Sequence, residues 1–258
     1  MRLMKRILSA AAVLALSASL LVGCSSGTAS SVPVSESSAA ESTVSSVEET
    51  ASSAVDENEA AAAQLLNDLT GSYQELWPVI LADEYKQTWL DDCTALVGED
   101  NAEAAFEKLS SMVTGDVYGE DAVKAYANGG GAYFCGFTNS LATLTFDGET
   151  STISGTDKDG NVLFSHTYHY IGMEPVHGLY EFESDDADSG EFTYFFLAPD
   201  TSAETYHIEF RYGSDAEALS QYDAGEYAYW VASGISTDCD QTMIDNCIEL
   251  FCTENLAG

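Results

Sequence analysis

The apolar positions that follow residue 60 recur at first with the period of a helix. Ala104, Ala105, Leu109 and Met112 are separated by steps that place them on one side of a helix. The same period predicts helices at residues 61–70, 76–85, 101–113 and 241–253. Thr237 and Asp238 are the expected cap of the last of them.

The pattern changes from helices to strands after the glycine run at residues 129–131. Short runs of β-branched and aromatic residues are then separated by turn dipeptides such as Asp147-Gly148 and Asp159-Gly160. These runs predict strands at residues 132–137, 141–146, 150–156, 161–171, 178–184, 191–197 and 205–212. Strands about ten residues apart favour an antiparallel barrel or sandwich over a βαβ fold. We expect one α+β domain at residues 61–258, an antiparallel β-barrel with N-terminal helices and a C-terminal helix.

The first 24 residues have the organisation of an export signal. Met1–Arg6 holds three of the eight basic residues, and Ile7–Val22 is an apolar run that is short for a membrane span. Leu21–Cys24 resembles the bacterial lipobox, in which the cysteine becomes the lipidated first residue. We expect residues 1–23 to be a lipoprotein signal peptide and Cys24 to anchor the protein on the extracytoplasmic face of the cell membrane. An ordinary signal peptide with a chance cysteine is the alternative.

Residues 24–60 contain twelve serines and neither aromatic nor basic residues. Such a segment buries too little apolar surface to offset the entropy of ordering it. We expect a disordered tether between the anchor and the domain.

The net charge and the absence of enzyme motifs exclude some classes of function. The 43 acidic and 8 basic residues give a net charge of −35, and an anionic surface of this kind repels a phosphate backbone, which excludes nucleic-acid binding. The sequence has no nucleophile elbow, no metalloprotease motif, no phosphate-binding loop and no dinucleotide fingerprint. We therefore expect no enzymatic activity.

The cysteines and histidines are the candidate site residues. Besides Cys24 there are five cysteines, an odd number, and Cys247 and Cys252 lie about 140° apart around a helix, so they do not easily bond to each other. We expect both to be buried core residues. His207 shares one face of its strand with Thr205 and Glu209. It is either a buried core residue or a metal ligand with Glu209 beside it.

Six segments of the second half form an ordered series along the chain: Tyr168–Gly172, Leu179–Glu183, Phe192–Phe195, Thr205–Ile208, Phe210–Leu219 and Tyr227–Trp230. This series resembles the ZinT family of exported zinc-binding domains. With a looser match from Gly71 to Leu90, the resemblance spans about residues 71–255. It implies a lipocalin-like (calycin) barrel with zinc held mainly by three histidines near one mouth.

The resemblance transfers only one of those histidines, His207. Thr205 stands at the position of the first histidine of the pair, and the histidine of the preceding strand falls near Asp200 or Phe195. Zinc takes three or four nitrogen, sulfur or oxygen ligands. Asp200, His207 and Glu209, with His177 as a further candidate, are the expected ligands.

The resemblance implies a lipid-anchored domain that binds a divalent metal, zinc above all, for capture or homeostasis, with a metal transporter as a possible partner. The alternative is a calycin-type barrel that has lost the metal site. Such a barrel would bind a small ligand or a protein through its aromatic interior.

Overall fold

The computed structural model describes residues 45–198 and 207–257, and for residues 45–56 the backbone alone. The signal peptide, Cys24 and Asp200 lie outside the described residues. No helix in the described ranges is long and apolar enough to cross a membrane.

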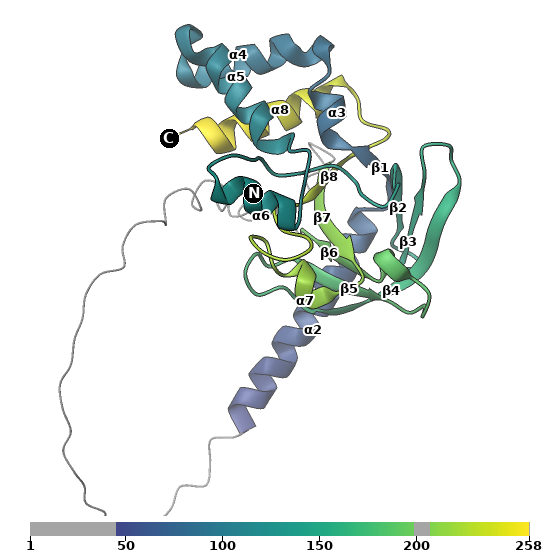
Figure 1. Cartoon of the computed structure of the whole chain (residues 1–258). Helices are drawn as coiled ribbons and strands as arrows, with labels where there is room; N and C mark the ends of the chain where they lie inside the picture. Colours follow the sequence, from purple (N-terminus) through teal and green to yellow (C-terminus); the bar gives the residue numbers. More distant parts are fainter. Residues whose placement is uncertain (1–44, 199–206, 258) are drawn as a thin grey trace, which may run out of the picture.

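Eight strands and several helices make up the described chain (Figure 1). The strands are β1 (Gly71–Glu75), β2 (Thr143–Asp147), β3 (Thr152–Thr156), β4 (Val162–Met173), β5 (Tyr180–Ser184), β6 (Tyr194–Leu197), β7 (His207–Gly213) and β8 (Ala232–Ser236). The α-helices are α2 (Ser45–Asp68), α3 (Leu76–Ile80), α4 (Lys86–Val97), α5 (Glu99–Val113), α6 (Glu120–Ala127), α7 (Ala216–Leu219) and α8 (Gln241–Leu256). Short 3-10 turns lie at Asp83–Tyr85 and Gly190–Phe192.

The strands form a closed barrel in which each pairs antiparallel with its neighbours in sequence, and β1 closes the ring on β8. The predicted α+β class and lipocalin-like barrel are confirmed. Two of the barrel strands, β1 and β8, were not predicted. Conversely, the predicted strand at 132–137 is not a barrel strand, because only Phe134 forms isolated bridges, to Thr114 and Trp230.

The barrel interior is filled by its own aromatic side chains. Phe195, Phe210 and Tyr212 are fully buried and lie with their ring centroids 5.4 to 6.4 Å apart. Phe164 stacks on Phe192 at 4.0 Å in the same core cluster. Aromatic pairs at such distances stabilise a core beyond the area they bury.

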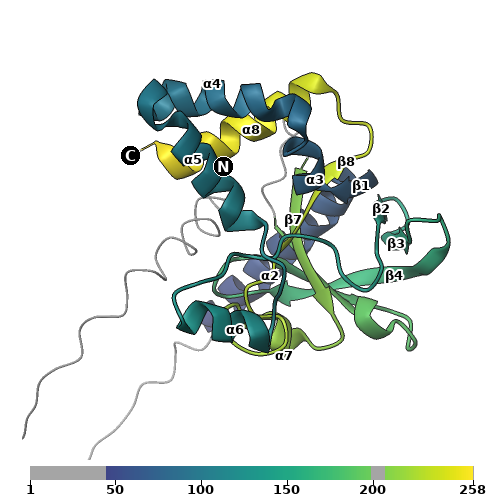
Figure 2. The same cartoon turned by 45° about the horizontal axis from the view of Figure 1, so that its top comes forward.

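A second apolar cluster lies outside the barrel, among α3, α4, α5 and α8. These helices gather at one end of the barrel in both views (Figures 1 and 2). Phe251 of α8 lies 4.8 Å from the Trp77 ring of α3 and 6.0 Å from the Trp89 ring of α4. Asp240 caps α8 by accepting a hydrogen bond from Met243 N at 3.0 Å, two residues beyond the predicted cap.

Helix α2 begins at Ser45, inside the segment that the sequence analysis assigned to a disordered tether. No glycine or proline interrupts residues 34–68, and alanine and glutamate favour helix. Ala62, Leu65, Leu66 and Leu69 are buried in the main core and hold the C-terminal half of the helix on the barrel, so that the helix can extend from a fixed end. The high serine content favoured the prediction of a disordered segment, although the helix extends into it.

Candidate functional site

Strand β7 carries two of the predicted ligands on the face that points away from the barrel interior. Ile208, Phe210 and Tyr212 belong to the main core cluster, so the alternate residues His207, Glu209 and Arg211 face outward. These outward residues are also buried, because α3, α8 and the chain after β7 cover them.

His207 and Glu209 are 4% and 8% exposed and line one small cavity together with Cys247 of α8. The cavity has a volume of about 10 Å³, and Leu76 and Phe251 close it on the helical side. The prediction that His207 and Glu209 share a face is confirmed by this cavity. The space beside them is about that of a single water.

His177 lies in a different environment, in the turn that follows β4. Its Nδ1 is 3.4 Å from Glu174 Oε2, and its ring stacks on Tyr222 with centroids 3.8 Å apart. The Tyr222 ring in turn lies 4.1 Å from the guanidinium of Arg211. Since Arg211 is four residues beyond His207 on the same strand, about 13 Å separates the two along β7. His177 therefore belongs to a group around Arg211.

The Glu174 carboxylate is fully buried in this group. Burial alone would raise its pKa, but hydrogen bonds from the His177 side chain, the His177 backbone N–H and the Val176 backbone N–H hold the pKa below its ordinary value. The backbone of this turn thus satisfies the Glu174 carboxylate and holds it beside the His177 ring.

The described residues do not fit the ligand set that zinc requires. No group of three or more histidine, cysteine, aspartate or glutamate side chains that could hold a metal ion occurs in residues 45–198 and 207–257. His207 and Glu209 are together, His177 is with Glu174, and Asp200 is outside the described residues. Because no three such side chains converge in the described residues, the set falls short of the three or four ligands of a protein zinc site.

A larger pocket opens where the wall of the barrel changes partner. Strand β1 pairs with β8 as far as Glu75, opposite Gly234, and the chain then turns into α3. On the N-terminal side of Gly234, β8 and the residue before it pair instead with residues 134–135. Val231 N donates to Phe134 O at 3.1 Å, and Ser233 N donates to Cys135 O at 3.0 Å. The pocket lies in the gap between α3, this segment and the end of α5.

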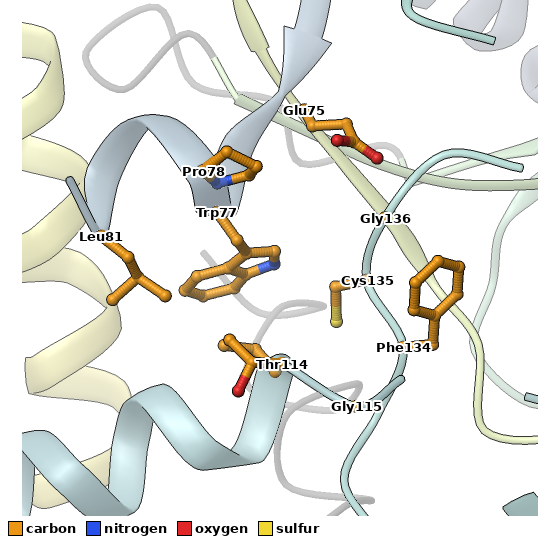
Figure 3. Close-up of a pocket in the computed structure, with 10 residues that line it drawn as sticks. Glu75, Trp77, Pro78, Leu81, Thr114, Gly115, Phe134, Cys135 and Gly136 are labelled. Atoms are coloured by element: carbon orange, nitrogen blue, oxygen red, sulfur yellow. The ribbon is translucent and has the colours of Figure 1, made fainter. Parts of the chain in front are cut away.

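This pocket, called here the β1–α3 pocket, has a volume of about 310 Å³ (Figure 3). Its lining is mostly apolar, and the residues are Glu75, Trp77, Pro78, Leu81, Val113, Thr114, Gly115, Phe134, Cys135 and Gly136. Pockets of this size, with an apolar wall and a few polar groups, are typical small-molecule sites.

The polar groups of the pocket have distinct roles. Glu75 Oε1 accepts a hydrogen bond from Phe137 N at 2.5 Å, which joins the end of β1 to the segment that replaces it. Trp77 is 7% exposed, and its buried Nε1–H meets no nitrogen or oxygen acceptor among the described residues. Figure 3 shows the indole nitrogen turned toward Cys135.

The Cys135 thiol is 6% exposed. Burial and the nearby Glu209 carboxylate raise its pKa, more than contacts with Ser233 and Trp77 lower it. The thiol therefore stays protonated at neutral pH, and a protonated thiol is a poor nucleophile. The pocket presents a carboxylate and apolar walls, and the indole N–H of Trp77 is buried beside the Cys135 thiol.

Glu75, Trp77 and Cys135 were not predicted as site residues. The pocket forms only because residues near 75 and near 135 meet along the same edge of β8, where the second segment takes over from β1. No local pattern carries that information. The one local sign was the glycine run at 129–131, which marked a break in regular structure before the lining segment.

The fold defines the class of the protein, a closed eight-stranded antiparallel barrel with a helical layer at one end. No protein-family model matches the chain, and no curated protein matches it in sequence.

The solved structures that are similar to the chain include two of one protein. The first is the Zn(II)-bound ZinT-like domain of Streptococcus pneumoniae AdcA, with 15% identity and a TM-score of 0.44 over 70% of this chain and 87% of that domain. The second is Zn(II)-bound AdcA from the same organism, with 14% identity and a TM-score of 0.43 over 72% of this chain. The chain spans 35% of the length of AdcA.

Proposed function

We propose that the protein is a binding protein without enzymatic activity, held on the extracytoplasmic face of the membrane by a lipid on Cys24. Its ligand is a small, partly apolar molecule without negative charge, and its site is the β1–α3 pocket. The observation that carries this proposal is the pocket itself, with its apolar lining and the Glu75 side chain.

The filled barrel interior supports a site at this end of the barrel. Ligand-binding barrels of eight strands hold their ligand inside, which requires an open interior. Here Phe195, Phe210 and Tyr212 occupy that space and are fully buried. The expected ligand site in the aromatic interior is thus replaced by a site outside it.

The chemistry of the lining selects the ligand. Glu75 favours a cation or a neutral donor over an anion, and the net charge of −35 acts in the same direction. Pro78, Leu81 and Phe134 provide apolar surface for a ring.

The test compares three probes that share one ring and differ in charge: benzyl alcohol, benzylamine and benzoate. Binding to the full-length protein in detergent is measured by ligand-observed NMR. We expect benzyl alcohol and benzylamine to bind and benzoate to bind at least ten-fold more weakly.

The matched variants are Thr114→Trp, which fills the pocket from its exposed rim, and Ser111→Trp, at an exposed position one turn earlier on α5 that does not line the pocket. Thr114→Trp should lower the affinity for both bound probes at least ten-fold, while Ser111→Trp should leave it unchanged. Benzoate binding as tightly as benzylamine, or indifference to Thr114→Trp, would refute the site.

Binding of a divalent metal such as zinc, for capture or delivery to a transporter, is the second candidate. It is supported by His207 and Glu209, which lie together in one cavity with Cys247. It needs ligands beyond those that the described residues bring together.

Calorimetric titration with zinc at 0.05 and 0.3 M salt separates the two candidates. A site built on His207 should lose at least ten-fold in affinity in His207→Ala and keep its affinity at the higher salt. Binding that falls with salt and ignores His207→Ala comes from the anionic surface. That second outcome is the one we expect.

A further inference from the structure

Two cysteines on different helices have their sulfur atoms in contact. Cys93 of α4 and Cys252 of α8 are 159 residues apart in sequence, and their Sγ atoms are 3.9 Å apart. Both side chains are fully buried, at 0% exposure, in the helical cluster outside the barrel. In this structure both are thiols.

We propose that Cys93 and Cys252 form a disulfide in the exported protein, which joins α4 to α8. The proposal rests on the contact between the two sulfurs and on the export predicted from residues 1–24. It is independent of the ligand proposed above. Disulfides form and persist in extracytoplasmic, oxidising compartments.

The geometry requires little movement. A disulfide has its sulfur atoms about 2.05 Å apart, so each sulfur has to move by roughly 1 Å from its position in this structure. The two helices already pack against each other, since α4 and α8 share an apolar interface. No rearrangement of the barrel is involved.

The reaction balances with an oxidised thiol–disulfide oxidoreductase as co-reactant. Its disulfide is attacked by one cysteine thiolate to give a mixed disulfide, and the second cysteine then displaces the oxidoreductase as a dithiol. The S–S bond between Cys93 and Cys252 forms while the S–S bond of the oxidant breaks. The two thiol hydrogens end on the reduced oxidoreductase.

The burial of the two thiols determines when the disulfide forms. Burial raises the pKa of both thiols, and for Cys252 the neighbouring Cys93 raises it further. Thiols kept protonated and out of contact with solvent react slowly. Oxidation therefore takes place during folding, before α8 has closed over α4, and the finished bond is sheltered.

The bond would fix the helical layer next to the β1–α3 pocket. Phe251, the neighbour of Cys252, packs against Trp77 with ring centroids 4.8 Å apart, and Trp77 forms one wall of that pocket. Holding α8 on α4 thus also supports the position of Trp77.

The first experiment maps the disulfide in full-length protein exported by a bacterial host, with free thiols alkylated at lysis. Trypsin leaves Cys93 in the peptide 87–108 and Cys252 in the peptide 212–258. Mass spectrometry without reductant should find these two peptides linked, and dithiothreitol should separate them. Complete alkylation of Cys93 in the unreduced sample would overturn the proposal.

Two matched variants on α8 identify the partner of Cys93, because the peptide 212–258 also contains Cys239 and Cys247. Cys252→Ser should abolish the linked peptide, and Cys247→Ser, at a buried position on the same helix, should leave it intact. A link that survives Cys252→Ser would contradict the assignment.

Thermal unfolding gives an independent measurement. A bond that closes a loop of 159 residues restricts the unfolded chain, so reduction should lower the Tm of the wild-type protein by about 10 °C. The double variant Cys93→Ser/Cys252→Ser should show no change in Tm with reductant. An unchanged Tm of the wild-type protein on reduction would also contradict the proposal.

Discussion

The two faces of β7 are both buried, yet their chemistry is opposite. The inner face carries Ile208, Phe210 and Tyr212, and the outer face carries His207, Glu209 and Arg211. In most half-buried strands the polar face is the one in contact with water. Here each face has its own packing partner.

The inner face of β7 packs in an apolar core and carries one polar group, the Tyr212 hydroxyl. The Phe210 ring lies 5.4 Å from the Phe137 ring, and the Tyr212 hydroxyl is directed toward the backbone of Thr138. That hydroxyl donates to Thr138 O at 3.0 Å and accepts from Thr138 N at 2.6 Å. The inner face therefore closes the barrel onto the segment that follows the pocket.

The outer face uses hydrogen bonds in place of apolar contact. Arg211 is fully buried and donates to the backbone carbonyls of Leu219, Gln221 and Tyr227. The guanidinium thus attaches β7 to the segment that runs from the end of α7 to Tyr227. The comparison shows that alternating polar residues on a strand can mark a structural attachment as well as a solvent face or a site.

The largest effect that tests this comparison is expected for Arg211→Ala. The change leaves several buried carbonyls without donors and opens a cavity, so it should lower the free energy of unfolding by about 4 kcal/mol. Urea denaturation of the full-length protein measures it. Arg211→Lys, which keeps the charge and some donors, should be less costly. A loss below about 1 kcal/mol for Arg211→Ala would mean that the outer face behaves as a solvated surface.

The sequence predicted six of the eight barrel strands but missed the two that close the ring. β2 to β7 contain β-branched and aromatic residues, whereas β1 (GSYQE) and β8 (ASGIS) are five residues long with a single large apolar residue each. Their pairing partners, and not their composition, make them strands. Short strands of small and polar residues lack a local signal.

The candidate site shows the same limit. The period of two correctly placed His207 and Glu209 on one face. It did not reveal that the face is buried, since the covering residues Leu76 and Phe251 come from helices at the two ends of the domain. His177 was an expected ligand only by residue type, and its pairing with Glu174 depends on the turn after β4.

The next largest effect is expected on the inner face, for Phe210→Ala. The side chain is fully buried among rings, so its truncation should cost about 3 kcal/mol through lost burial and the cavity left behind. Phe210→Leu, which keeps most of the volume, should cost about 1.5 kcal/mol. If Phe210→Ala cost less than Phe210→Leu, the interior would be open space, and a ligand inside the barrel would become the better hypothesis.

The smallest effect is the pH dependence of the group around Arg211, tested with Glu174→Gln. The pKa of Glu174 is held below its ordinary value in the folded protein, so its ionised form stabilises the fold. That contribution is present above about pH 4.5 and is lost as the pH falls through the folded-state pKa. The difference in unfolding free energy between wild type and Glu174→Gln should therefore shrink from pH 6 to pH 3.5. Glu181→Gln is the matched control: burial and Glu174 raise the pKa of Glu181, so its charged form destabilises the fold and its difference should run in the opposite direction. A Glu174→Gln difference that stays constant with pH would show that the His177 and Glu174 pair contributes packing alone.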